Sequence, residues 1–470
     1  MEVAACLPVY RTYVRPGELA SERDTQLIGR AIKRARTDRP ELDGDLLTFL
    51  RDLLCGRIQG RHEGELVARF QQLTGPAMAK GLEDTSFYVY NRLICLNEVG
   101  GDPAAFGGDL EGFHRFCQRL ALRWPRNMLS TSTHDTKRSE DVRPRIAALS
   151  EVPERWAEAL QRWTRMAAKH RTTPAGDDGP ALPDANTEWY LYQTLVGVWP
   201  LSLERCLAHL EKAGREAKEH TSWLRPDERF EAAVRAFATG LLGDSEFVAD
   251  FEAFLAPLLG PARVAALGQA LIKLTAPGVP DVYQGNEVWD FSLTDPDNRR
   301  AVDFERRRAL LRDLKDLGPE EVLARDAEGA SKLHVTRQAL ELRRRRPELF
   351  ASSADYQPLA AQGAQAERVV AFSRAGGAVV VAVPRWLLGL SHDVLGDAGQ
   401  GVGHADGRGQ GIWREGVWGD TALPLPGGPD ARYTNLLVGE DVDRGGEQGV
   451  QVSELWRRFP VALLERKETS

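Results

Sequence analysis

The densest cluster of residues that could do chemistry lies at residues 130–141, which read STSTHDTKRSED. The cluster follows a short apolar segment and precedes a helical pattern, so we expect it at the carboxyl end of a strand, where α/β barrels place catalytic groups. There the Asp135 carboxylate, next to His134, could contact a substrate hydroxyl while Lys137 and Arg138 hold it ionised. The alternative is a helix N-cap followed by a solvated run of charges, which a His-Asp dipeptide alone does not exclude.

A second polar segment, at residues 277–287, also follows an apolar run. It carries Tyr283, Gln284 and Glu287 into a glycine-containing loop. We expect this loop and the Asp135 loop to end neighbouring strands and to share one pocket. The alternative is a turn that does nothing more than end a strand.

A third segment, at residues 79–88, combines Lys80 and Glu83 with the aromatic residues Phe87 and Tyr88. This composition suits a sugar, because the polar groups can bond its hydroxyls while a ring stacks on its apolar face. Any surface loop with an aromatic anchor has a similar composition, and that interpretation stays open.

Signatures of other chemistries are missing from the sequence. We find no dinucleotide-binding glycine motif, no P-loop lysine, no HExxH zinc helix and no GxSxG elbow. The five cysteines form no CxxC pair, which favours reduced structural thiols. We therefore predict no metal and no cofactor.

The length of 470 residues corresponds to about three domains. A hydrophobic fraction of 42% and a charged fraction of 27% are typical of folded proteins. The net charge of −7 argues against nucleic acid or an anionic membrane as a partner. We find no secretion signal and no apolar stretch near the about 18 residues that cross a bilayer, so a cytoplasmic protein is expected.

Hydrophobic periodicity gives a first outline of the elements before residue 150. It predicts a strand at residues 7–14, helices at 21–36, 46–54 and 65–73, and a second strand at 127–133.

Residues 150–270 have an almost entirely helical pattern. Two aromatic stripes at helical spacing predict core packing, and their members are Trp156, Leu160, Trp163 and Ala167, then Trp189, Tyr192, Val196 and Trp199. A linker is expected at 172–184, a strand and loop at 275–290, and an arginine-rich helix at 330–347.

The character changes after residue 350. Two β-branched runs, 368–373 and 378–383, flank Gly376 and Gly377, which predicts a hairpin. Residues 396–428 are typical of long loops, and a small antiparallel β domain should close the chain.

Taken together, these motifs resemble one family. Residues 131–143 are similar to the fourth signature region of the α-amylase superfamily (glycoside hydrolase family thirteen), in the form found in maltooligosyl trehalose synthases. Further segments match that family in order along the chain: 8–13, 79–85, 97–103, 220–223, 277–287 and 295–300.

The resemblance implies an α/β fold: the C-terminal part of a (β/α)8 TIM barrel with a helical insertion, followed by an all-β sandwich domain. It places late barrel strands in 1–149, the insertion in 150–270, the last barrel strand and helix in 271–347, and the sandwich in 348–470.

The implied activity is intramolecular transglucosylation, which converts the reducing-end α-1,4 bond of a maltooligosaccharide to an α,α-1,1 bond. By resemblance, Asp135 is the transition-state stabiliser. The implied substrate-binding residues are His134, Lys80, Glu83, Tyr283 and Gln284. The alternatives are an α-glucan hydrolase or transferase of the same superfamily, or a non-catalytic glucan-binding fragment.

The chain matches only part of the family pattern. The three earlier signature regions, which hold an Asn-His pair, the nucleophile and the acid/base, have no counterpart. Retaining glycosyl transfer needs two carboxyl groups about 5–5.5 Å apart, for which Glu83, Asp84 and Glu98 are weak candidates. We therefore expect a C-terminal portion that is inactive alone, with a maltooligosaccharide and the missing half-barrel as its partners.

Overall fold

The computed structural model describes residues 1–173, 180–390, 416–428, 430–446 and 448–467. The chain divides into two compact units. Unit 1 contains Met1–Asn91 and Glu211–Glu228, and unit 2 contains Arg92–Leu210 and Arg229–Ser470.

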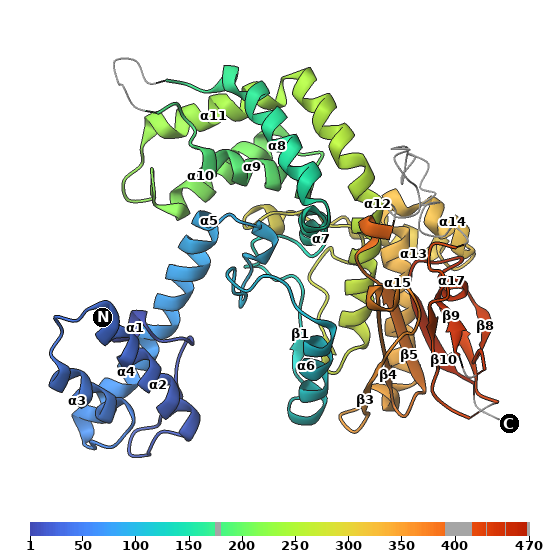
Figure 1. The fold of residues 1–470 in the computed structure, drawn as a ribbon, viewed down its shortest axis with the longest axis horizontal. Helices are drawn as coiled ribbons and strands as arrows, with labels where there is room; N and C mark the ends of the chain where they lie inside the picture. The colour runs from blue at the N-terminus through green and yellow to red at the C-terminus, as the bar shows by residue number, and fades with distance from the viewer. Residues whose placement is uncertain (174–179, 391–415, 429, 447, 468–470) are drawn as a thin grey trace. The chain divides into compact units, whose positions relative to one another are not determined.

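Unit 1 is built from helices whose apolar faces meet in one core. The predicted helices at 21–36, 46–54 and 65–73 are confirmed as α2, α3 and α4, each longer than predicted (Figure 1). The Ser21 side chain caps α2 by accepting a hydrogen bond from the backbone of Asp24 at 3.1 Å. The elements of unit 1 are α1 (Glu2–Ala5), α2 (Glu22–Asp38), α3 (Gly44–Leu54), α4 (Arg61–Met78), a π-helix (Ala79–Ser86), α5 (Phe87–Val89) and the end of α10 (Leu203–Ala217).

The prediction of a strand at residues 7–14 is wrong, because this segment is irregular. A side chain takes the place of a partner strand. The Gln71 amide accepts from the backbone nitrogen of Val14 at 2.8 Å and donates to its carbonyl at 2.9 Å. These bonds satisfy the backbone groups of Val14 without a β-ladder.

The helical prediction for 150–270 is confirmed within unit 2. Trp163 lies in the core, where its ring centroid is 5.2 Å from those of both Phe251 and Phe254. Of the linker, residues 174–179 lie outside the described residues. The helices of this region are α8 (Pro153–Ala167), α9 (Ala185–Val198), α10, α11 (Glu228–Leu242) and α12 (Ser245–Thr275).

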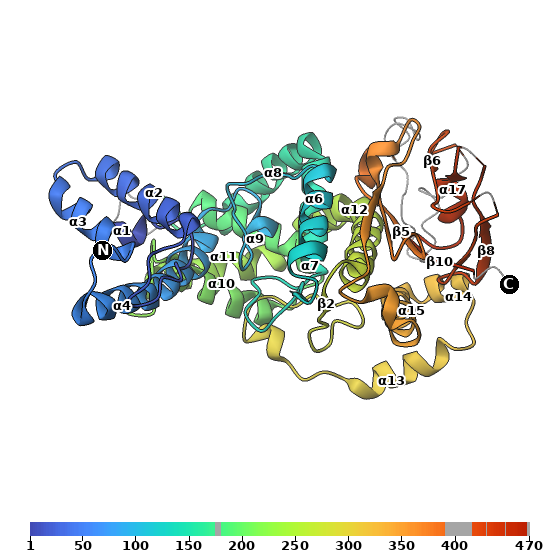
Figure 2. The ribbon, with the colours of Figure 1, turned by 90° about the horizontal axis from the view of Figure 1, so that it is seen from below.

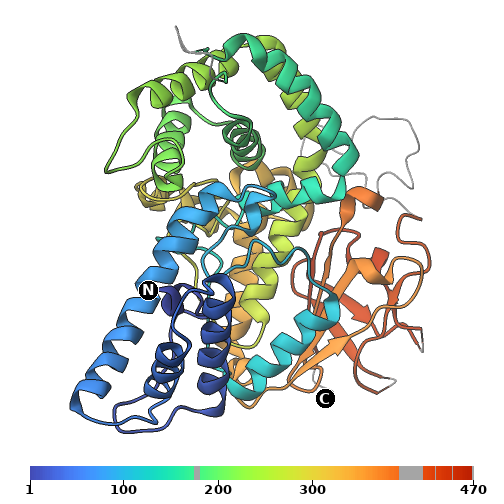
Figure 3. The same cartoon turned by 60° about the vertical axis from the view of Figure 1, so that its left-hand side comes forward.

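Helix α12 corrects the statement that no stretch could cross a bilayer. By length and composition alone, this 31-residue helix could do so. Its most apolar window is 56% buried, however, and α12 packs against α8, α15 (Ala330–Arg345) and strand β5 (Val379–Pro384). Figure 3 shows α12 passing from the helical layer to the sheet. These contacts identify α12 as a core helix of unit 2.

Two predicted strands form a short parallel pair. Strand β1 (Met128–Leu129) pairs with β2 (Val279–Pro280), and Met128 is in register with Val279. The structure thus confirms both strands but limits each to two residues. The other helices of unit 2 that precede the sheet are α6 (Leu110–Arg123), α7 (Val142–Ala147), α13 (Phe304–Asp313), α14 (Pro319–Ala324) and α15, with 3-10 turns at Ile94–Leu96, Ala148–Glu151, Ala168–His170, Asp297–Arg299 and Asp326–Glu328.

The predicted hairpin is confirmed as β4 (Val369–Arg374) and β5, which pair antiparallel. Gly376 and Gly377 both have positive φ angles, 62° and 83°, as the tight turn requires. Residues 396–415 of the expected loop region lie outside the described residues.

The hairpin belongs to a six-stranded antiparallel sheet in the order β3-β4-β5-β10-β7-β8. Alternate residues of β5 face opposite cores. Val381 packs toward α12 and α15, whereas Val380 packs with Trp418 and Trp456. The remaining bounds are β3 (Tyr356–Leu359), β6 (Ala422–Leu423), β7 (Arg432–Asn435), β8 (Glu440–Asp443), β9 (Val450–Gln451), β10 (Ala462–Arg466) and α17 (Val452–Leu455), with 3-10 turns at Pro347–Phe350 and Ala366–Arg368. Figure 2 shows α12 and α17 on opposite sides of β5.

The described chain is therefore helix-rich with an antiparallel sheet, which agrees with the expected α/β class.

Candidate functional site

The parallel pair fixes where the two polar loops of unit 2 begin. Because β1 and β2 run in the same direction, the Asp135 loop and the loop after β2 leave the pair at the same end. The backbone nitrogen of Asp281 donates to the Leu129 carbonyl at 2.8 Å and extends the pairing to the start of the second loop. This geometry confirms that the two loops follow neighbouring strands.

Side chains join the two loops. The Asn286 amide donates to the Ser132 hydroxyl at 3.0 Å. The Asn298 amide donates to the His134 carbonyl at 3.1 Å, and the Tyr283 hydroxyl donates to the Asn298 carbonyl at 3.3 Å. Asn298 thus links Tyr283 to His134 through two hydrogen bonds. The exposed Gln284 instead lines a cavity whose lining includes neither His134 nor Asp135.

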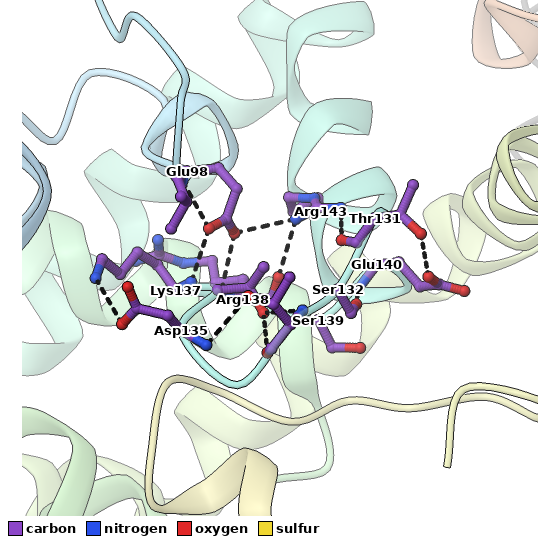
Figure 4. Close-up of polar contacts among 12 residues, drawn as sticks. Glu98, Thr131, Ser132, Asp135, Lys137, Arg138, Ser139, Glu140 and Arg143 are labelled. Carbon is purple, nitrogen blue, oxygen red and sulfur yellow. Dashed lines mark hydrogen bonds and ion pairs between the residues drawn. The ribbon is translucent and has the colours of Figure 1, made fainter. Parts of the chain in front are cut away.

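The Asp135 carboxylate is presented to solvent beside a buried cation. Its side chain is 50% exposed, and one of its oxygens lies 3.8 Å from the Lys137 ammonium, whose side chain is 3% exposed (Figure 4). The loop turns tightly here, because the Asp135 backbone nitrogen donates to the Thr133 hydroxyl at 3.1 Å. His134 is exposed next to it.

The expected role of Arg138 is corrected by the structure. Its guanidinium does not pair with Asp135 but donates to the Ile94 carbonyl at 3.1 Å and lies 5.4 Å from the centre of the Tyr190 ring. Since side chains at successive positions of this turn point in different directions, only one of the two neighbouring cations reaches the carboxylate.

Glu98 holds the backbone of the Asp135 loop in place. Its carboxylate accepts hydrogen bonds from the backbone nitrogens of Lys137 and Arg138, at 2.9 and 3.2 Å, and from the Arg143 guanidinium at 3.0 Å (Figure 4). Arg143 also donates to the Thr131 carbonyl. A carboxylate with three such donors fixes the loop, a role that spacing in the sequence does not reveal.

A buried ion cluster holds the far end of the same loop. The Lys332 ammonium lies 2.8 Å from Glu140 and 2.7 Å from Asp141, and Lys273 lies 2.9 Å from Glu140. All four side chains are at most 6% exposed. Two cations balance two carboxylates, as burial of charge requires. The sequence analysis did not identify Lys273 or Lys332 as part of the site. The only feature that could have identified them is the position of each lysine within a helix that also carries buried apolar residues.

The electrostatics of this cluster follow from burial and pairing. Burial opposes the charge of Glu140, but Lys332 and Lys273 outweigh it and lower the pKa of Glu140 to about 2. Burial raises the pKa of Asp141 to about 6, although Lys332 opposes the shift. The Asp141 carboxylate also accepts the backbone nitrogen of Asp290 at 2.8 Å, so the cluster ties both loops together.

Lys80 and Glu83 lie in unit 1, on the π-helix. The Lys80 side chain is 75% exposed and its ammonium is 2.5 Å from Asp84. Glu83 is buried and accepts a hydrogen bond from the Tyr10 hydroxyl.

The segment around residue 220 contacts this π-helix. The Lys218 ammonium donates to the Thr85 hydroxyl at 2.8 Å. The family-like motifs at residues 79–85 and 220–223 both belong to unit 1. The expectation that Phe87 or Tyr88 offers a stacking face is not met, because these side chains are only 1% and 6% exposed. Their rings are part of the packed interior.

Among the side chains that the structure describes, no group of three or more His, Cys, Asp or Glu could hold a metal ion.

The relatives found by comparison with known proteins carry the same name, maltooligosyl trehalose synthase. No protein-family model matches the chain. Two Mycobacterium tuberculosis proteins named maltooligosyl trehalose synthase are 40% identical to it over 410 residues, which is 86% of this chain and 46% of each relative.

Solved structures give the same picture. Maltooligosyltrehalose synthase from Arthrobacter ramosus is similar with a TM-score of 0.81 and 36% identity, covering 99% of this chain and 53% of that one. A Sulfolobus tokodaii protein described as a hypothetical maltooligosyl trehalose synthase has a TM-score of 0.67 and 27% identity, with 99% and 53% covered. The chain therefore spans about half the length of the relatives it matches.

Proposed function

We propose that this chain, a homologue of the maltooligosyl trehalose synthases, forms part of an enzyme that converts the reducing end of a maltooligosaccharide to a trehalose unit. The observation that carries the proposal is the half-exposed Asp135 carboxylate at the end of β1. It lies on a loop that Glu98 and a buried ion cluster hold in place. Rigid support of this kind is what a catalytic group needs.

In this proposal, Asp135 stabilises the positive charge that develops on the sugar in an oxocarbenium-like transition state. His134 and Tyr283 contact the same sugar, and Gln284 binds at the edge of the site. The nucleophile and the acid/base come from the part of the relatives that this chain does not span. The barrel portion, the helical insertion and the closing sandwich, within the boundaries given above, complete the proposed architecture.

Lys80 is proposed to hold the released glucose while it turns to attack through its anomeric hydroxyl. Its side chain is 75% exposed, so its ammonium can reach a sugar hydroxyl without disturbing the core. Glu83 would bind the sugar by exchanging its hydrogen bond from Tyr10. Keeping the glucose bound and water out is what separates a mutase from a hydrolase.

Lys80→Ala is expected to raise the share of hydrolysis severalfold, because glucose then leaves before it is re-attacked. The measurement is the ratio of free glucose to non-reducing product from maltopentaose. It uses a fusion of this chain to the part of the Arthrobacter ramosus protein that it does not cover. Lys33→Ala, an exposed lysine of α2, is the control.

An unchanged product ratio in the Lys80 variant would remove this residue from the mechanism. A fusion that releases only glucose and shorter glucans would instead support the alternative, an α-glucan hydrolase. A chain that binds maltopentaose but never supports turnover in any fusion would be a non-catalytic glucan-binding fragment.

A further inference from the structure

A separate cavity of about 510 Å³ lies in unit 2, beside the loop that follows β2. Its walls include the rings of Trp199, Trp289 and Phe291, and its lining is rich in arginine. The volume falls within the range of about 300–1,000 Å³ that is typical of small-molecule sites.

Arg145 brings a buried charge without an ion pair to this cavity. Its side chain comes from α7 and is 5% exposed, yet no carboxylate of the described residues lies within ion-pair distance of it. One guanidinium nitrogen donates to the Trp199 carbonyl at 2.8 Å, and the group stacks 3.6 Å from the centre of the Phe291 ring. Its Nε is buried with no hydrogen-bond partner. A desolvated donor of this kind is costly unless something binds it.

Arg263 adds a second cation to the same lining. It comes from α12 and pairs with Asp326 at 3.0 Å, but its buried Nε also has no partner. Burial, followed by repulsion from Arg263, lowers the pKa of Arg145 to about 9, although Asp141 opposes the shift. Both arginines line the cavity, and an anion bound there could accept hydrogen bonds from their buried Nε groups.

None of the described carboxylates that line the cavity forms an ion pair with Arg145. Asp297 is held by Arg205 at 2.7 Å and by Arg300 at 3.2 Å. Asp290 accepts from the backbone and hydroxyl of Ser292. Asp303 is exposed at the start of α13, where it accepts the backbone nitrogen of Arg306 at 2.9 Å, and the remaining lining cation, Arg307, pairs with Glu287 at 3.1 Å. Among the described carboxylates, Arg145 therefore has no ion-pair partner.

We propose that this cavity binds a phosphate-type oxyanion, free or carried by a small sugar, between the guanidinium groups of Arg145 and Arg263. Arginine is well suited to such anions because its planar fork donates two parallel hydrogen bonds. The aromatic walls leave room for an apolar sugar face beside the anion. This site shares Gln284 with the proposed Asp135 site but includes neither His134 nor Asp135 in its lining, and its ligand is charged.

The test is calorimetric titration of the full chain with inorganic phosphate, glucose 6-phosphate and glucose, at an ionic strength matched with sodium chloride. Both anions should bind and glucose should not. Arg145→Met should weaken anion binding at least about tenfold, which is the effect of losing one charge-assisted contact. Arg263→Met should weaken it too, and Arg308→Met, at an exposed arginine outside the lining, should leave it unchanged.

The two anions identify the source of the phosphate group. Equal affinities indicate free phosphate, and tighter binding of glucose 6-phosphate indicates a sugar phosphate. Absence of binding for both anions at about 10 mM, or glucose binding as tightly as its phosphate, would overturn the proposal. Wild-type affinity in the Arg145 variant would do the same. If that variant does not fold, Arg263→Met carries the test, since its side chain is 32% exposed.

Discussion

Asp135→Asn is expected to lower kcat by about 10²–10³-fold without unfolding the protein, a cost of about 3–4 kcal/mol in the transition state. The amide keeps the size of the side chain but loses the charge that would face the oxocarbenium-like sugar. Folding should be unaffected because the side chain is 50% exposed and its ion pair with Lys137 is long, at 3.8 Å. Steady-state turnover of maltopentaose by the fusion described above is the measurement.

Asp313→Asn is a matched control for that substitution. Asp313 is also 50% exposed and also pairs with a cation, Arg325 at 3.0 Å. The control should retain full turnover. Equal activity in the two variants would exclude Asp135 from the mechanism.

Lys332→Met should destabilise the chain by about 3–5 kcal/mol, because it leaves two buried carboxylates with a single lysine. Glu140 and Asp141 are 5% and 3% exposed, so water cannot replace the lost ammonium. Urea unfolding at pH 8 measures the effect, and Lys315→Met, at an exposed position, serves as the control. A loss below about 1 kcal/mol would mean that the cluster does not hold the loop.

The same variant should show a larger response to acid than the wild type. Asp141 already has a raised pKa; without Lys332 it rises further, and the pKa of Glu140 rises above its unfolded value, so the native state binds more protons than the unfolded state. The free energy of unfolding of the variant should therefore increase as the pH falls from 8 to 5. Adding Asp141→Asn should restore part of the loss at pH 8, since it removes one uncompensated charge.

The sequence predicts best where local periodicity and burial agree. The stripe through Trp156 and Trp163 is predictable because it repeats at the helical period, and the hairpin at Gly376 because two β-branched runs flank a pair of glycines. The strand predicted at 7–14 failed because the hydrogen bonds of Val14 go to Gln71, 57 residues away. No local pattern contains that information.

Part of the candidate site could be predicted from the sequence and part could not. The neighbouring loops of Asp135 and Tyr283 could be placed from the apolar segments before them. The supports of those loops could not, since Glu98, Lys273 and Lys332 reach them from distant parts of the chain. The burial of Phe87 likewise depends on packing that composition does not encode.

In the proposed function, this chain supplies Asp135 to an active site whose other two carboxylates come from outside it. The most direct measurement is the loss of reducing ends from maltopentaose, with the 470-residue chain alone and with its fusion to the complementary part of the Arthrobacter ramosus protein. We expect no loss with the chain alone, and loss without release of glucose with the fusion. Turnover by the chain alone would overturn the proposed function and would show that a complete pair of catalytic carboxylates lies within these residues.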